Sequence, residues 1–196
     1  MNSKIAIKQL KALEKYTDPA LRLAAEWDEP WKILIATILS AQTRDEKTIE
    51  ICEILFRKFN RVENLARADL KEIRKIIRPI NYYKTKSKNI KKTARMISAG
   101  IPEDIEGLLE LPGVGRKVAN VYLVEAFKAE AIGVDTHLSF IAQHLHWSKS
   151  KNPYAIEKDL ENLFPKRYWN SINYICVRFG RTYNKKDQIK ILKKLL

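Results

Sequence analysis

The most informative segment of this 196-residue sequence is Leu111-Pro112-Gly113-Val114-Gly115-Arg116-Lys117. A predicted helix ends at Leu111 and another begins at about Arg116, so two glycines separated by one residue turn the chain in a tight hairpin. The N–H groups of the hairpin and of the following helix N-terminus would point outward together, an arrangement that suits one phosphate oxygen. An ordinary helix connection with a glycine cap is the alternative.

Two ionisable residues follow the hairpin at helix starts. Lys117 lies in the first turn of its helix, where the helix dipole and desolvation lower an amine's pKa toward the nucleophilic free base. Asp135 comes eighteen residues later, in Val134-Asp135-Thr136-His137, at the start of another predicted helix. One helix and one return loop fit between them, so both side chains can face one cleft. A phosphate-binding lysine and an N-capping aspartate are the alternatives.

The formal net charge of +14 is unevenly distributed along the chain. Residues 71–100 hold ten basic side chains and one acidic side chain, and residues 148–196 hold twelve basic and four acidic ones. Between them, residues 101–147 hold three basic and seven acidic side chains. Two basic blocks around an acidic one are explained by a polyanion partner, although exposed lysines that only confer solubility are the alternative.

The whole chain reads as helical, because it contains six glycines and seven prolines and no useful strand alternation. An N-terminal helix has Ile5, Leu10 and Leu13 as its apolar stripe. Thr43 is expected to cap the third helix in a capping box with Glu46. The other helices are predicted over 31–42, 44–59, 69–77, 84–98, 103–111, 116–127, 136–145, 152–163, 166–179 and 185–196.

Several classes of protein are excluded. Only two cysteines, Cys52 and Cys176, are present, which rules out a disulfide framework and any four-cysteine metal site. The longest apolar runs, such as 33–38, are too short to span a bilayer. No signal peptide opens the chain, so we expect a cytoplasmic protein without a membrane partner. His144 and His146 have no cysteines or carboxylates near them at the spacing of metal ligands, so no bound metal is expected.

Four ordered motifs resemble the helix-hairpin-helix DNA glycosylase superfamily, in its endonuclease III branch. They are similar to that branch over roughly residues 20–147. The motifs are Leu39-Ser40-Ala41-Gln42-Thr43-Arg44-Asp45, Ile80-Asn81-Tyr82-Tyr83-Lys84-Thr85-Lys86-Ser87, Leu111-Pro-Gly-Val-Gly-Arg-Lys-Val-Ala-Asn120 and Val134-Asp135-Thr136-His137.

The resemblance implies an all-α fold of two helical lobes with a DNA-binding cleft between them. A six-helix barrel over residues 20–130 would carry the hairpin at 111–117. Residues 1–19 and 131–196 would form the second lobe. The implied partner is double-stranded DNA with a damaged base or an abasic site, the implied state is a monomer, and in a prokaryote the protein would be nucleoid-associated.

The resemblance also implies a chemistry. Lys117 would attack C1′ of a flipped nucleotide and form a Schiff base, and Asp135 would assist proton transfer and stabilise the cationic sugar. Such a bifunctional enzyme would remove damaged bases, with oxidised pyrimidines as the leading class, and nick abasic sites by β-elimination. The same fold acting on uracil, G:T mismatches or 8-oxoguanine is one alternative. A non-catalytic DNA-binding protein is another, but it would need neither side chain.

Further residues of this sequence are expected to contact DNA. Gln42 matches the residue that fills the gap left by the flipped nucleotide, and Tyr82 falls at the position of a wedge in the base stack. Lys84 and Lys86 suit phosphate contacts. His137 is expected to be structural. The hairpin contacts would come from Gly113, Val114, Gly115 and Arg116.

One departure from the family pattern concerns its iron–sulfur cluster. Most endonuclease III relatives bind a [4Fe–4S] cluster through four C-terminal cysteines. Phe179-Gly180-Arg181 resembles the run that precedes them, but the first cluster position falls at about Asn184. We therefore expect no cofactor and no cluster, and the basic residues of 148–196 would replace the DNA contacts of the cluster loop.

Overall fold

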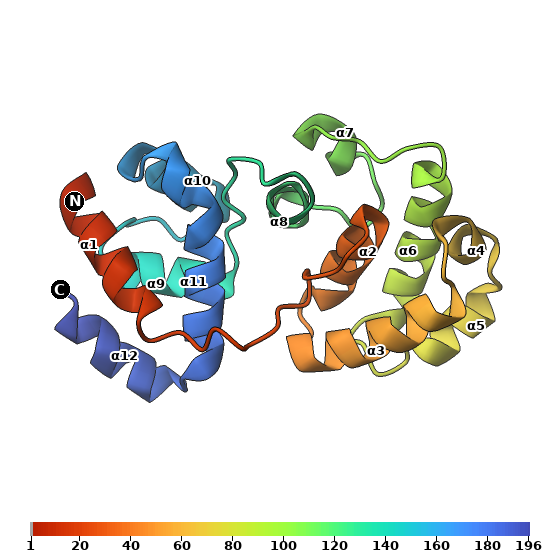
Figure 1. Ribbon diagram of the computed structural model, residues 1–196, viewed down its shortest axis with the longest axis horizontal. Helices are drawn as coiled ribbons and strands as arrows, with labels where there is room; N and C mark the ends of the chain where they lie inside the picture. The colour runs from red at the N-terminus through yellow and green to blue at the C-terminus, as the bar shows by residue number, and fades with distance from the viewer. Residues whose placement is uncertain (1) are drawn as a thin grey trace. The chain divides into compact units, whose positions relative to one another are not determined.

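A computed structural model describes residues 2–196 as an all-helical chain that divides into two compact units (Figure 1). One unit is Arg22–Phe127, and the other joins the residues up to Leu21 with Lys128–Leu196. The all-helical prediction is confirmed, because the described residues contain no strand. The predicted lobe boundaries fall at 19/20 and 130/131, and the chain changes unit after Leu21 and after Phe127.

The unit Arg22–Phe127 contains seven helices and carries the hairpin. The bounds of these helices are α2 (Pro30–Ser40), α3 (Asp45–Lys58), α4 (Val62–Arg67), α5 (Leu70–Ile76), α6 (Tyr83–Ile97), α7 (Ile105–Leu109) and α8 (Arg116–Phe127).

Helix α2 forms the centre of this unit. Its residues from Ile33 to Leu39 are all buried, as the nearly continuous apolar sequence predicts. It contacts α3, α6 and α8, and Figure 1 shows it between α6 and α8. Pro30 occupies the first turn, where its missing N–H costs no helical hydrogen bond. The helix ends at Ser40, two residues before the predicted end.

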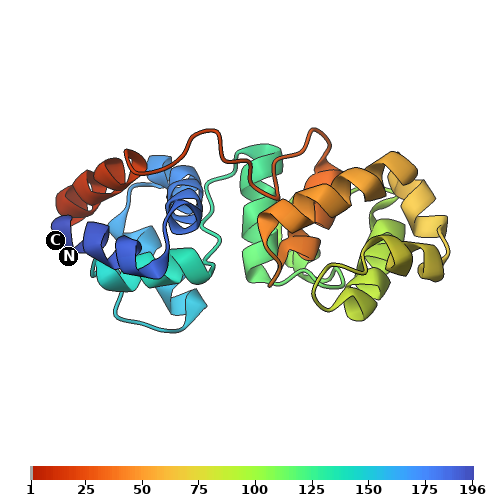
Figure 2. The ribbon, with the colours of Figure 1, turned by 90° about the horizontal axis from the view of Figure 1, so that it is seen from below.

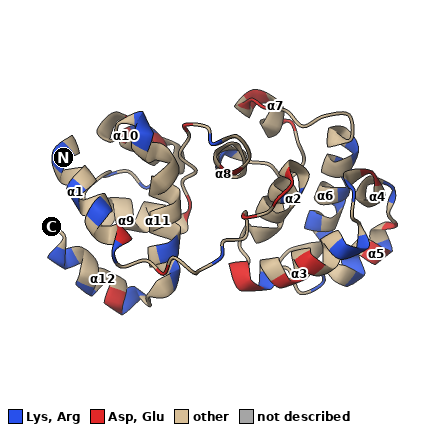
Figure 3. Ribbon diagram, viewed as in Figure 1, with Lys and Arg blue, Asp and Glu red and all other residues tan. Residues whose placement is uncertain are grey.

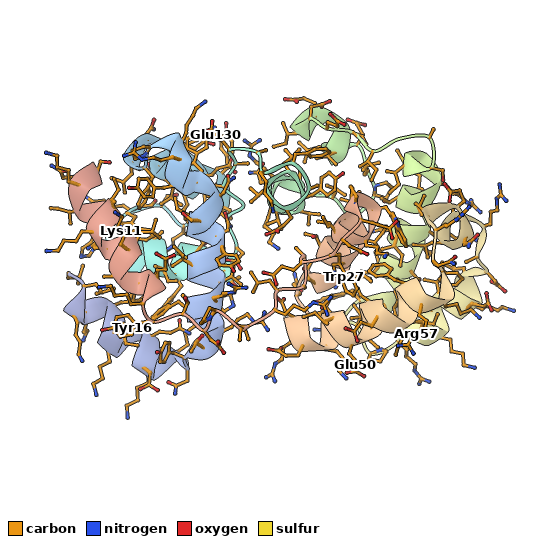
Figure 4. The ribbon with its side chains drawn as sticks, in the orientation of Figure 1. Lys11, Tyr16, Trp27, Glu50, Arg57 and Glu130 are labelled. Atoms are coloured by element: carbon orange, nitrogen blue, oxygen red, sulfur yellow. The ribbon has the colours of Figure 1, made fainter. Side chains whose placement is uncertain are left out.

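The start of α3 differs from the prediction. Its N-cap is Arg44 rather than Thr43, and no side chain caps it, so the predicted capping box with Glu46 is wrong. The Thr43 hydroxyl instead accepts a hydrogen bond from the amine of Lys86 on α6. The hydroxyl that the local pattern assigned to the cap is thus bonded to a residue of another helix. On α3 itself, the side chains of Glu50 and Arg57 extend away from α2 (Figure 4).

The second unit is built around α11. Its elements are α1 (Ser3–Glu14), α9 (Thr136–His144), α10 (Pro153–Leu163), a short 3₁₀ helix η1 (Lys166–Tyr168), α11 (Trp169–Thr182) and α12 (Lys185–Lys194). Helices α1, α9 and α12 all contact α11. Their shared core includes Leu10, Leu138, Ile172, Phe179 and Leu192.

A buried polar residue ties the two ends of this unit together. The Gln9 amide on α1 donates to the carbonyl of Leu195 at 3.0 Å, and its oxygen accepts from the Trp147 indole at 2.8 Å. Figure 2 shows the first and last helices beside each other. With Gln9 facing inward, Ile5 turns outward and is 51% exposed, so its predicted place in the apolar stripe is wrong.

None of the helices in residues 2–196 combines the length and the apolar character that a membrane span requires.

Candidate functional site

The hairpin between α7 and α8 rests on α6. Gly113 has a φ of 84°, a left-handed conformation that favours glycine. A Cβ at Gly113 would lie 2.9 Å from the amide nitrogen of Asn89 on α6. One turn further along α6, the Thr93 hydroxyl donates to the carbonyl of Pro112 at 2.9 Å. These contacts fix the hairpin against α6.

The N–H groups of the hairpin do not all point outward. The Val114 N–H donates to the carbonyl of Leu111 at 3.0 Å and the Val114 side chain is buried, so its predicted role as an outward donor is wrong. The N–H groups of Gly113, Gly115 and Lys117 have no hydrogen-bond acceptor among residues 2–196. Unpaired donors at a helix N-terminus provide an anion site. Arg116, the first residue of α8, is half-buried beside them.

The surroundings of Gly115 give a prediction that separates function from folding. A Cβ at Gly115 would meet no atom within 4 Å, and the residue is exposed. Its carbonyl accepts the first helical bond from Ala119, so Gly115→Ala should cost at most about 1 kcal/mol as an N-cap change. If a phosphate approaches here, the methyl group should weaken duplex binding roughly tenfold to a hundredfold, since hydrogen bonds to a charged group are lost. Thermal unfolding and DNA titration check the two effects.

Gly113→Ala is the matched control for this prediction. The positive φ of Gly113 and the contact with Asn89 make an added methyl group costly, and we expect a loss of roughly 1–3 kcal/mol in the free energy of unfolding. A Gly115→Ala protein with normal stability and normal DNA affinity would contradict the assignment of this hairpin to a phosphate.

Lys117 is the second residue of α8 and is half-buried. Its amine makes no hydrogen bond or ion pair with any other described residue. No acidic residue lies in the first turn of α8 to balance the helix dipole. An amine in this position is available for chemistry and is not consumed by the fold.

Asp135 is the N-cap of α9, as the sequence predicts, and its carboxylate accepts from the N–H of Leu138 at 2.8 Å. It is half-buried. The start of α9 is fixed against α11, because a Cβ on Gly180 would lie only 2.1 Å from Nδ1 of His137. The Asp135 charge also acts on the Lys185 amine. Burial lowers the pKa of that amine, and the charge of Asp135 opposes the shift in part. His137 is thus packed within its own unit, as expected of a structural residue.

Gln42 and Tyr82 lie on two turns of unusual geometry. Gln42 has a φ of 56° and Tyr82 a φ of 58°, both in the left-handed region that residues with a Cβ rarely occupy. Gln42 is exposed and Tyr82 is 67% exposed. The Asn81 amide donates to the Gln42 carbonyl at 2.5 Å and joins the two turns. Such outliers, when exposed, are typical of functional positions.

Lys84 and Lys86 are the two lysines predicted to contact phosphates, and only Lys84 is exposed. Lys86 is 7% exposed and its amine is bonded within the protein, so its prediction as a phosphate contact is wrong. Burial lowers the pKa of the Lys86 amine to about 8. The exposed lysines of α6 still give that helix a basic surface (Figure 3).

The residues present do not fit an iron–sulfur cluster. Cys52 lies buried in the unit Arg22–Phe127, and Cys176 lies buried in the apolar core of the other unit. Asn184, at the position of the first cluster cysteine, caps α12 by accepting from the N–H of Asp187. Gln188 then bonds the carbonyls of Gly180 and Tyr183. Within residues 2–196, no group of three His, Cys, Asp or Glu side chains could hold a metal ion.

With this geometry established, comparisons with known proteins identify the family. The family model described as "HhH-GPD superfamily base excision DNA repair protein" matches residues 35–166. Endonuclease III of Thermotoga maritima is 37% identical over 157 residues, which cover 78% of this chain and 74% of that protein. Endonuclease III of Synechocystis sp. is 35% identical over 188 residues, which cover 91% and 86%.

A solved structure is similar over nearly the whole chain. It is titled "Structure of a Trapped Endonuclease III-DNA Covalent Intermediate: Estranged-Adenine Complex". The TM-score is 0.86 at 30% identity, covering 93% of this chain and 88% of that one. The chain therefore belongs to the helix-hairpin-helix (HhH-GPD) superfamily of base excision DNA repair proteins. Within it, the protein is an endonuclease III-like DNA glycosylase.

Proposed function

We propose that this protein is a bifunctional enzyme that removes oxidised pyrimidines from double-stranded DNA and nicks the resulting abasic site. The observation that carries the proposal is the Lys117 amine, which has no partner among residues 2–196 and lies in the first turn of a helix that follows a hairpin with unpaired N–H groups. A protein that only binds DNA needs the hairpin but has no use for this amine. The proposed working state is a monomer, which in a prokaryote would be associated with the nucleoid.

In the proposed reaction, the lone pair of the Lys117 Nζ attacks C1′ of the damaged nucleotide. The C1′–N bond breaks, and the base leaves with the electrons of that bond and takes up a proton. The amine loses a proton, the C1′–O4′ bond of the sugar ring breaks and O4′ takes up a proton, which gives a Schiff base between Nζ and C1′. Loss of a proton from C2′ then expels the 3′ phosphate, and water hydrolyses the Schiff base to release Lys117.

Asp135 is proposed to support the first of these steps through its carboxylate. Positive charge develops on the sugar as the base leaves, and a nearby carboxylate in a site of low dielectric stabilises that charge. The bond from the Leu138 N–H holds the carboxylate in one orientation, so little reorganisation is needed during the reaction. The same group is proposed to assist proton transfer.

Gln42 and Tyr82 are proposed to enter the base stack where the damaged nucleotide leaves it. The Gln42 amide can both donate and accept hydrogen bonds toward the unpaired base on the opposite strand. The Tyr82 ring can wedge between neighbouring bases and lower the cost of extruding the nucleotide. Their exposure and their joined turns support this assignment.

A panel of duplexes tests the substrate class. Matched duplexes would carry thymine glycol, uracil, a G:T mismatch, 8-oxoguanine or an abasic site, and single-turnover base release and strand nicking would be measured separately. The proposal predicts the fastest base release from thymine glycol, with nicking that keeps pace with it. Faster release from one of the other bases would change the substrate class, and base release without nicking would reject the lyase step.

We also propose that the enzyme works without an iron–sulfur cluster. Protein purified under reducing, iron-replete conditions should be colourless, contain no stoichiometric iron and keep its full activity after treatment with a chelator. The capped helix α12 supports this prediction, because its bonds occupy the segment where the family pattern places the cluster. Iron in a 4:1 ratio to protein, with visible absorption, would contradict it.

A further inference from the structure

Lys86 has an unusual environment for a lysine. The residue is only 7% exposed. Its ammonium group donates to the carbonyls of Leu39 at 2.7 Å and Ala41 at 2.5 Å. It also donates to the hydroxyl of Thr43 at 3.2 Å. All three N–H donors of the ammonium group are therefore used, and none remains for a DNA phosphate.

These acceptors lie at and just beyond the C-terminus of α2. Helix C-termini leave carbonyl groups unpaired and carry partial negative charge. The last turn of α2 has no basic residue of its own. Lys86 supplies both the donors and the charge from another helix, and so fixes the path of the chain from Leu39 to Thr43. The residue inside that path with a left-handed backbone is Gln42.

Lys86 is linked to the second turn as well. Its backbone N–H donates to the carbonyl of Tyr82 at 3.0 Å, a bond that forms the first turn of α6. Asn81, next to Tyr82, donates through its side chain to the Gln42 carbonyl. Two residues, Lys86 and Asn81, thus hold both left-handed turns in one arrangement. We call the four residues Gln42, Asn81, Tyr82 and Lys86 the paired turns.

We infer that Lys86 is a positioning residue which, with Asn81, holds Gln42 and Tyr82 ready to occupy the gap in a damaged duplex. This inference rests on the proposed function of those two side chains. A left-handed backbone at a residue with a Cβ is unfavourable and persists only where the surroundings impose it. If the turns are formed before binding, no conformational entropy is lost in ordering them on binding, and the affinity for the damaged duplex is not reduced by that loss.

The inference makes a specific claim about discrimination. Phosphate contacts act on any duplex, whereas an element that fills a gap acts only where a nucleotide has left the stack. Loss of Lys86 should therefore weaken binding to a duplex with an abasic analogue and leave binding to the intact duplex unchanged. Loss of a phosphate contact would weaken both to a similar extent.

The experiment is a double-mutant cycle on binding, which needs no catalysis. The dissociation constants of a duplex with a stable tetrahydrofuran abasic analogue and of its undamaged counterpart would be measured for the wild type, Lys86→Met, Gln42→Ala and the double variant. We expect Lys86→Met to weaken abasic binding about tenfold and undamaged binding less than twofold. The double variant should be no weaker than Gln42→Ala, since the Lys86 side chain acts on the turn of Gln42 and its bond to Tyr82 is a backbone bond that methionine keeps.

Two outcomes would overturn the inference. One is that Lys86→Met weakens both duplexes equally, and the other is that its effect multiplies with that of Gln42→Ala. Lys71→Met, at an exposed lysine on α5, is the control for loss of one positive charge. If Lys86→Met does not fold, Asn81→Ala takes its place in the same cycle, and unchanged abasic binding by that variant would reject the inference.

The proposed function is judged separately by strand nicking of the wild-type protein. An active wild type with an additive cycle would reject the positioning role alone. An inactive wild type with a non-additive cycle would reject the enzymatic proposal. The paired turns would then be a binding element for duplexes with an abasic site.

Discussion

Lys117→Ala is expected to lower the single-turnover rate of strand nicking at an abasic site by at least about 10³-fold, because the nucleophile of the covalent route is lost. Binding to the abasic duplex should change by less than about threefold, since the hairpin N–H groups and the basic surface of α6 remain. The change removes no hydrogen bond or ion pair within residues 2–196, so thermal unfolding should be unaffected.

Lys71→Ala is the matched control for this change. Lys71 is the second residue of α5, as Lys117 is the second residue of α8, and it is exposed. It should nick at the wild-type rate, which would exclude a general effect of removing a lysine near a helix N-terminus. Nicking by Lys117→Ala within about tenfold of the wild type would contradict the role of Lys117 as the nucleophile.

Asp135→Asn is expected to slow base release by about 10²- to 10⁴-fold with little loss of DNA affinity, because the neutral amide cannot stabilise a positive sugar or accept a proton. The asparagine oxygen can still accept from the Leu138 N–H, and asparagine caps helices as well as aspartate does. The stability of α9 should therefore be preserved. Single-turnover base release and thermal unfolding together separate the catalytic effect from the structural one.

The same substitution at another cap controls for the loss of charge. Asp69 is the N-cap of α5, as Asp135 is of α9, and its carboxylate accepts from the N–H of Lys71 at 2.9 Å. Asp69→Asn should leave base release unchanged. An equal rate for Asp135→Asn and the wild type would show that Asp135 is only a cap.

Much of the fold follows from local patterns in the sequence. The continuous apolar run of α2, the caps at Asp69, Asp135 and Asn152, and the glycine hairpin each predict an element that the structure contains. Helix α4 was not predicted, because six residues are too few for a helical period to stand out. These elements depend on neighbours within a few positions of the chain.

The errors occur where a distant residue decides the outcome. Thr43 has the sequence of a cap, but the Lys86 amine from α6 takes its hydroxyl. Ile5 fits an apolar stripe, but the inward position goes to Gln9, which bonds Trp147 and Leu195. Neither partner can be found from the residues around Thr43 or Ile5.

Lys86 itself could have been recognised. It lies four residues before Ile90, on the same helical face as the buried Ala94 and Ile97, so the spacing places it inside. A lysine on a buried face needs acceptors, which the end of a neighbouring helix provides. Its charge alone places it with the exposed basic residues of 71–100, whereas its helical position places it inside. The supports of the hairpin, Asn89 and Thr93, show the same helical spacing on α6.

Borohydride trapping with mapping of the crosslink would show which residue, if any, attacks C1′ of the sugar. The protein would be incubated with a duplex that carries an abasic site, reduced with borohydride and digested, and the peptide bound to DNA would be identified by mass spectrometry. We expect a covalent product attached at Lys117 that is absent from Lys117→Ala. Attachment at another lysine, or tight binding and nicking without any trapped product, would contradict it.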